Sequence, residues 1–261
     1  MNKREWSGMT KYLSFIAIPL FILLLFIGQG IGLFDPRFFP SFSDVWKSYA
    51  SMLNDGSLLR GFEYSLMRIT CATLVAVFIS LAVAITIILY KPIRYLVEPL
   101  TSSFRFIPVT AMYPILILWV GIGETMKIAF ITIALLFYFL PTILLQVNEV
   151  EKSLIETALT LGASKFDLVA KVIMPAMLPS LLSSLGMMYG IGWTYVIVAE
   201  IVNAGYGLGH IMNIAQSRGR LDMVFAVLFA IVLFSFVFDK GWNIFVQKLF
   251  PWKFKISGGI E

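Results

Sequence analysis

The stretch EVEKSLIETALTLGASKFDLVAKVIMP, residues 149–175, is a polar segment in a chain that is otherwise mostly apolar. It is rich in charged side chains, and a strongly apolar segment lies on either side of it. Because unpaired charge is costly inside hydrocarbon, such a stretch is expected to lie in water between two membrane spans.

Two short helices are predicted within this stretch. Ser153 followed by Glu156, and Ser164 followed by Asp167, each fit a capping box, in which the two side chains satisfy free backbone N–H groups at a helix start. Gly162 fits a helix stop, because glycine adopts the left-handed conformation without steric cost. A helix, a glycine turn and a second helix form a compact, water-exposed element that another protein can bind.

Composition indicates a polytopic, all-α membrane protein. Hydrophobic residues make up 59% of the 261 residues and charged residues only 13%, which is too little polar surface for a soluble domain. The single cysteine, Cys71, excludes a disulfide framework within the chain, and the single histidine, His210, excludes a multi-histidine metal site. The net charge of +5 comes from basic residues at the ends of apolar segments, which is typical of membrane topology rather than nucleic-acid binding.

Six apolar segments are long enough to be membrane spans, all within one transmembrane domain covering 1–261. A basic head before the first segment also fits a cleaved signal peptide, but the segment is longer than a signal core and no small-x-small site follows, which favours a retained span. Between the first two spans, an amphipathic helix capped by Ser41 or Ser43 is predicted. The predicted spans are 12–34, 61–90, 99–120, 127–147, 176–202 and 223–245.

The distribution of basic residues predicts the orientation. Lysine and arginine are more numerous in the segments that lie inside if both termini are cytoplasmic, and this bias sets topology. Residues 149–175 are then cytoplasmic. The inner residues are Lys3, Arg4, Lys11, Lys91, Arg94, Lys152, Lys165, Lys171, Lys248, Lys253 and Lys255, and the outer ones are Arg37, Lys47, Arg60, Lys127, Arg218 and Arg220.

Motifs for catalysis are absent from the sequence. No glycine-rich phosphate loop followed by Lys-Ser or Lys-Thr occurs, so the chain is not expected to hydrolyse a nucleotide by itself. There is no nucleophile elbow and no zinc motif, and one histidine offers little for a catalytic triad. A membrane-embedded enzyme is therefore disfavoured.

Residues 149–175 resemble the EAA loop of ABC importer permeases. In that family the pattern is Glu-Ala-Ala, three residues, Gly, nine residues, then Ile-x-Leu-Pro; here it is Glu156-Thr157-Ala158, Gly162 and Val172-Ile173-Met174-Pro175, with threonine in the middle position. The resemblance implies coupling helices that dock in a cleft of a separate ATPase subunit. The residues that it assigns to ATPase coupling are Glu156, Thr157, Ala158, Gly162, Ala163, Ser164 and Pro175.

Shorter motifs are similar to those of permeases for nitrate, taurine, alkanesulfonates and related solutes. They are Ser65-Leu66-x-Arg68, Pro99, Arg105-x-Ile107-Pro108, Trp119-Val120-Gly121-Ile122-Gly123-Glu124 with Lys127, Trp193 with Ala199-Glu200, and Gly207-Leu208-Gly209. The resemblance extends over about 39–250.

This resemblance implies the type I ABC importer permease fold, with six spans and cytoplasmic coupling helices, in a bacterial cytoplasmic membrane. It also implies a second permease copy in a homodimer, two ATPase subunits and an extracytoplasmic solute-binding protein. No cofactor is expected on this chain, because ATP and Mg²⁺ belong to the partner ATPase, and a small anion such as nitrate, taurine or another sulfonate is the expected solute.

Five residues in or near spans are candidates for the translocation path. Arg68 and Arg105 fit an anion path, since charge inside a membrane is a functional hypothesis by default; they also fit structural pairing with Glu63 or Glu98, or an interface position. Glu200 fits either a gate or a loop cap. Trp193 and Tyr195 fit either a cavity wall or simple packing.

One alternative function stays open. A stand-alone channel or secondary transporter needs a selectivity filter or paired charges deep in the spans, and it leaves residues 149–175 without a task.

Overall fold

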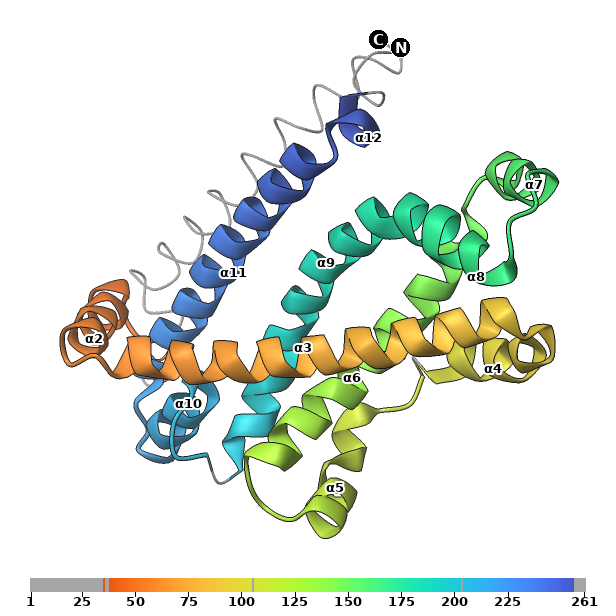
Figure 1. Ribbon diagram of the computed structural model, residues 1–261. Helices are drawn as coiled ribbons and strands as arrows, with labels where there is room; N and C mark the ends of the chain where they lie inside the picture. Colours follow the sequence, from red (N-terminus) through yellow and green to blue (C-terminus); the bar gives the residue numbers. More distant parts are fainter. Residues whose placement is uncertain (1–34, 36–37, 105, 203, 256–261) are drawn as a thin grey trace, which may run out of the picture.

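The computed structural model describes residues 35, 38–104, 106–202 and 204–255, and these residues form helices joined by short connections (Figure 1). The predicted first span, 12–34, lies outside the described residues, as do Arg105 and Asn203. The helices are α2 (Phe42–Asn54), α3 (Ser57–Leu89), α4 (Lys91–Phe104), η1 (Val109–Met112), α5 (Tyr113–Val120), α6 (Glu124–Asn148), α7 (Lys152–Thr160), α8 (Lys165–Asp167), η2 (Leu168–Ile173), α9 (Met174–Ile201), α10 (Leu208–Ser217), α11 (Leu221–Leu249) and α12 (Pro251–Lys255).

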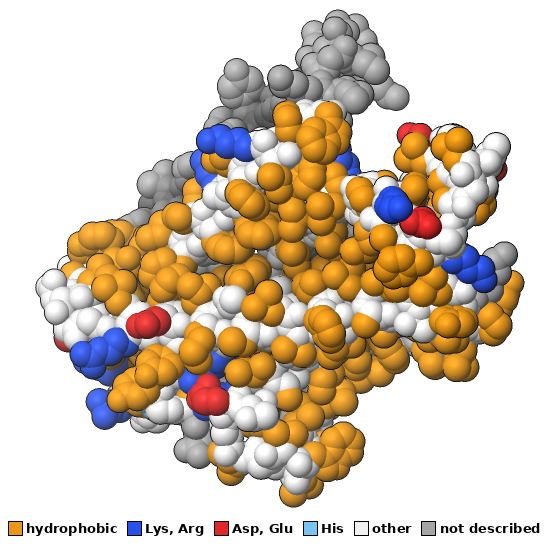
Figure 2. Space-filling view, in the orientation of Figure 1, with side chains coloured by type: hydrophobic (Ala, Val, Ile, Leu, Met, Phe, Trp, Pro, Cys, Tyr) orange, Lys and Arg blue, Asp and Glu red, His pale blue; other side chains and the backbone are white. Residues whose placement is uncertain are grey.

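Four helices in the described part of the chain are long and apolar enough to cross a membrane. They correspond to the predicted second, fourth, fifth and sixth spans, and the fifth runs without a break from α8 through η2 into α9. Hydrophobic side chains cover most of the face seen in Figure 2, and charged side chains gather toward the two ends of the bundle. The four helices are Ser57–Leu89, Glu124–Asn148, Lys165–Ile201 and Leu221–Leu249.

The segment 99–120, expected as one continuous span, is broken. Helix α4 ends at Phe104, Pro108 is extended, and α5 has only 8 residues. The break is explained by Pro108, which cannot donate a helical hydrogen bond and disfavours helical conformation in the residue before it. A helix as short as α5 is about 12 Å long, far less than the hydrocarbon thickness.

Helix α6 is the centre of the bundle. It is the most buried of the four long helices, and it makes the most extensive helix–helix contact of the described chain with α3 (Figure 1). Phe130, Leu135 and Phe139 of α6 are fully buried in the core. Because α9 packs against both α3 and α6, these three helices form one unit.

Helix α2 packs across α11, the least buried long helix. Ser41 caps α2 as predicted, with its Oγ accepting a hydrogen bond from the Asp44 amide. The Ser48 hydroxyl donates to Asp222 at 2.5 Å, and Arg220 donates to the same carboxylate at 2.7 Å. These bonds fix α2 against the start of α11.

The predicted aqueous stretch 149–175 forms a protruding turn and helix between α6 and α9 (Figure 1). Gly162 has φ +82° and ends the α7 segment, and Ser164 and Asp167 form a capping box, as predicted. The predicted box at Ser153 is wrong: α7 begins after Glu151, and the Ser153 hydroxyl donates to the Glu151 side chain instead. The second predicted short helix is the first part of the fifth span.

The close contact of α3 with α9 leads to a prediction about two glycines of α9. A Cβ on Gly192 meets Cγ2 of Ile69 at 2.7 Å, whereas a Cβ on Gly190 meets no atom within 4 Å. Overpacking of a tight core costs about 1–3 kcal/mol. We expect Gly192→Ala to lower the thermal unfolding midpoint, and Gly190→Ala to leave it unchanged or raise it, measured by tryptophan fluorescence of the purified chain.

Ile69 is fully buried, so Ile69→Ala is itself destabilising. We expect it to cost less in the Gly192→Ala background than in the unaltered chain, because it removes the atom that clashes. Equal shifts for the two glycine variants contradict this account of the helix contact.

Candidate functional site

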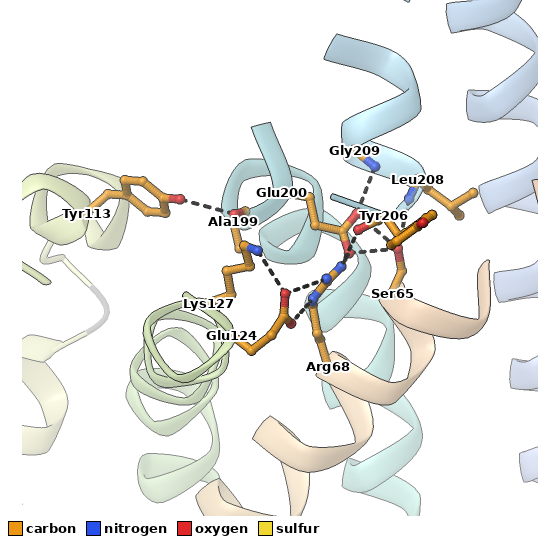
Figure 3. A network of polar contacts seen from close by, with 10 residues as sticks. All are labelled: Ser65, Arg68, Tyr113, Glu124, Lys127, Ala199, Glu200, Tyr206, Leu208 and Gly209. Carbon is orange, nitrogen blue, oxygen red and sulfur yellow. Dashed lines mark hydrogen bonds and ion pairs between the residues drawn. The ribbon is translucent and has the colours of Figure 1, made fainter. Parts of the chain in front are cut away.

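Eight residues from separate parts of the chain form one polar network (Figure 3). It lies where α6 begins and α9 ends, away from α7 (Figure 1). Helix α3 contributes the first two, α6 the next two, α9 the fifth, and the segment that follows α9 the last three. They are Ser65, Arg68, Glu124, Lys127, Glu200, Tyr206, Leu208 and Gly209.

Arg68 is the central residue of the network, with a side chain only 1% exposed. Its Nε and Nη2 donate to the two carboxylate oxygens of Glu124 at 2.6 and 2.8 Å. Its Nη1 donates to Glu200 Oε1 at 2.7 Å and to the Tyr206 carbonyl at 2.8 Å. All three nitrogens are used, and a lysine cannot replace this planar fork of donors.

Glu200 is 0% exposed and has several donors around its carboxylate. The Ser65 hydroxyl donates to it at 2.8 Å, the Gly209 amide donates at 2.8 Å, and Arg68 neutralises its charge. Ser65 Oγ in turn accepts from the Leu208 amide at 3.0 Å. A buried carboxylate is tolerated only with such donors and a counter-charge.

The two glycines around Leu208 are required by the position of Glu200. Gly207 has φ +138°, and a Cβ there would lie 2.3 Å from Glu200 Oε2. A Cβ on Gly209 would lie 2.6 Å from the carbonyl oxygen of Ile197. The Gly-Leu-Gly sequence therefore lets the backbone approach the carboxylate closely enough to donate hydrogen bonds.

Glu124 is the most exposed charged member of the network. Its side chain is 48% exposed, whereas Lys127, one turn along α6, is 2% exposed and donates to Glu124 Oε1 at 2.9 Å. Two cations and two carboxylates thus balance, and Glu124 shields both cations from solvent.

The structure brings together Arg68 and Glu200, which the sequence proposed for the translocation path. The sequence offered Glu63 and Glu98 as structural partners for Arg68 and Arg105. The structure instead pairs Arg68 with Glu124 and Glu200.

The other path candidates lie elsewhere. Trp193 is buried and stacks on Phe62 at 5.7 Å, and the Tyr195 hydroxyl lies 3.4 Å from that of Tyr138. Arg105 lies outside the described residues.

Sequence reasoning did not assign roles to Ser65, Glu124, Lys127 and the glycines. Each of them occurs in the short motifs that carried the resemblance, at the predicted outer ends of different spans. Charge balance could have identified Glu124, because an arginine inside a membrane requires an acidic partner at the same depth.

The predicted coupling residues lie at the other end of the molecule. Helix α7 has no buried residue, and Glu156 and Thr157 are exposed on it. Leu161 and Phe166, on either side of the Gly162 turn, are 82% and 72% exposed. Pro175 is the second residue of α9 and is also exposed.

The chain belongs to the family of binding-protein-dependent transport system inner membrane components, whose family model matches residues 76–250. It is therefore a multi-pass membrane protein, the permease of an ABC importer. Such a permease is a non-catalytic subunit that pairs with ATPase subunits, which hydrolyse the ATP, and with a binding protein.

Relatives include a putative ABC transporter permease of Methanocaldococcus jannaschii, 31% identical over 91% of both chains. The taurine transport system permease protein of Escherichia coli is 30% identical over 84% of this chain and 82% of its own. A putative aliphatic sulfonates transport permease of Bacillus subtilis is 24% identical over 98% of this chain and 94% of its own.

Solved ABC transporters share the fold. A chain of the inward-facing MetNI methionine ABC transporter aligns with a TM-score of 0.64 at 22% identity, over 74% of this chain and 95% of that one. A chain of an amino acid ABC transporter aligns with a TM-score of 0.65 at 19% identity, over 77% and 98%.

The glycines around Glu200 provide a test of the network. We expect Gly207→Ala to lower the thermal unfolding midpoint, because the methyl group displaces the Glu200 carboxylate and strained backbone costs on the order of 1–3 kcal/mol. Gly205→Ala is the matched control, since a Cβ there meets no atom within 4 Å. If Gly207→Ala is as stable as Gly205→Ala, the Gly-Leu-Gly sequence does not hold Glu200 as described.

Proposed function

We propose that this chain forms the membrane path for a small anion, of the taurine and sulfonate class, and that segment 149–175 docks on the ATPase subunit. The observation that carries the docking proposal is the exposure of Leu161 and Phe166 beside a polar helix. Large apolar side chains on a protruding polar segment are typical of a protein interface rather than of a solvated loop.

The local geometry supports a rigid docking element. Gly162 turns the chain sharply at φ +82°, and the Ser164–Asp167 capping box orders the residues that follow. Because residues 165–201 form one unbroken helix, a force on Phe166 acts directly on α9. The coupling residues in this proposal are Glu156, Thr157, Ala158, Gly162, Ala163, Ser164 and Pro175.

An anionic solute is supported by two observations. Relatives of this chain are named for taurine and for aliphatic sulfonates, both of which carry a sulfonate group. Arg68 and Lys127 are cations held at one end of the bundle, opposite to the docking segment.

The proposed assembly has two copies of this chain, two ATPase subunits and a solute-binding protein on the outer face. Both termini and segment 149–175 are cytoplasmic in this proposal, in keeping with the positive-inside rule. The proposal counts six membrane segments: the four long helices, segment 12–34 and the broken segment 99–120, whose short helix α5 does not cross the bilayer by itself.

Co-purification with the ATPase encoded nearest to this chain tests the docking proposal. We expect the tagged chain to retain an ATPase that hydrolyses ATP, and Leu161→Ser and Phe166→Ser to reduce retention at least about tenfold. A tenfold loss corresponds to about 1.4 kcal/mol, less than full burial of one such side chain provides. Glu156→Lys and Gly162→Leu are expected to have the same effect.

The matched control is Glu63→Lys, which makes the same charge change as Glu156→Lys at an exposed position of α3. Leu161→Ser and Phe166→Ser do not disturb a core, since both side chains are exposed. Normal ATPase retention by both of these variants rules out docking through this segment.

A further inference from the structure

The geometry points to an anion-binding site, called the anion seat below, that is formed by Nε and Nη2 of Arg68 and Nζ of Lys127. The Glu124 carboxylate occupies this site in the structure, in the position that a soluble oxyanion would take. The ligand class is a carboxylate or sulfonate. This inference rests on the proposed function as an anion permease, and it adds the site and the means of exchange.

The donor arrangement of the seat fits an oxyanion. Two nitrogens of Arg68 each donate to a different oxygen of Glu124, and Lys127 donates to one of the same oxygens (Figure 3). A free carboxylate carries two oxygens on one carbon and a sulfonate carries three on one sulfur, so either group has enough acceptors for the same three donors. Bidentate recognition of such groups is characteristic of arginine.

Burial distinguishes the seat from its occupant. The cations are 1% and 2% exposed, whereas Glu124 is 48% exposed. Arg68 keeps its bonds to Glu200 and the Tyr206 carbonyl without Glu124, and the Lys127 side chain is held in place by its burial on α6. Glu124 is the first residue of α6, so its side chain can rotate toward solvent while α6 stays in place.

Charge balance couples departure of Glu124 to arrival of another anion. With the Glu124 carboxylate withdrawn, Arg68 and Lys127 face only the single negative charge of Glu200. An uncompensated buried cation is strongly unfavourable. The seat therefore exchanges one anion for another.

Helix packing argues against the simpler idea of a latch that opens between α3 and α6. These two helices share the most extensive contact in the described part of the chain, and Arg68 and Glu124 lie on that pair. Parting the helices would disrupt the core, whereas rotating one half-exposed side chain would not.

An aromatic pair lies beside the seat. The rings of Tyr64 and Tyr206 are stacked at 5.0 Å, and Arg68 Cζ lies 5.7 Å from the centre of the Tyr64 ring. Both rings are partly exposed, so they offer an apolar surface for the organic part of a sulfonate or carboxylate.

Titration of the full-length chain with methanesulfonate tests the seat. The chain is placed in phosphatidylcholine nanodiscs, in which anionic lipid is absent, and its thermal unfolding midpoint is followed as sodium methanesulfonate replaces sodium chloride at constant ionic strength. A ligand that binds only the folded state raises this midpoint. We expect Glu124→Gln to bind with a half-saturating concentration at least about tenfold below that of the unaltered chain, because a tethered competitor acts at high effective concentration.

Two variants sharpen the comparison. Adding Lys127→Met to Glu124→Gln removes one donor of the seat and is expected to raise the half-saturating concentration again. Glu63→Gln, at an exposed site on the same helix as Arg68, is expected to respond like the unaltered chain. If Glu124→Gln does not fold, Glu124→Asp takes its place, since the shorter side chain leaves the seat partly open.

The anion site is wrong if Glu124→Gln and Glu124→Asp bind methanesulfonate no more tightly than Glu63→Gln does. ATPase retention by the same preparations reports separately on the proposed function. If methanesulfonate does not raise the unfolding midpoint of the Glu124 variants but the ATPase is retained, the anion site is wrong and the proposed assembly stands. If the unaltered chain does not retain the ATPase, the proposed assembly is wrong.

Discussion

The end of this molecule opposite to segment 149–175 depends on one buried guanidinium. Arg68 lies inside a bundle of apolar helices, where its charge is tolerated only because Glu124 and Glu200 supply opposite charge at 2.6 and 2.7 Å. Those carboxylates come from the start of α6 and the end of α9, so one side chain joins α3 to the ends of two further helices. The backbone after α9 is drawn into the same network, through Tyr206 and Gly209.

The two ends of the permease follow opposite rules. At the Arg68 end, charged groups are buried and paired, and glycine is needed because the backbone must approach a carboxylate. At the end that carries segment 149–175, large apolar side chains such as Leu161 and Phe166 are exposed, and Gly162 is needed because the chain must turn. Contacts within the chain satisfy the charges of the first end, whereas the apolar side chains of the second stay uncovered.

Helices α6 and α9 connect these two ends. Each has a member of the Arg68 network at one terminus and leads to segment 149–175 at the other, and α6 alone is about 37 Å long. If segment 149–175 docks on the ATPase as proposed, these two rigid helices would provide a physical link between the ATPase and the Arg68 network. An anion seat near Glu124 would place the solute at the far end of that link.

The sequence by itself determined the all-helical membrane class, four of the long spans, the glycine turn at Gly162 and the cap at Ser164. These features depend on local hydrophobicity and local backbone preferences, which neighbouring residues settle. The break of segment 99–120 near Pro108 is also a local effect, although the apolar run alone predicts a continuous span. Tertiary structure alone decided that Arg68 pairs with Glu124 and Glu200 rather than Glu63. These pairs join residues 56 and 132 positions apart, and hydrophobic periodicity carries no information about which helices meet or at what depth.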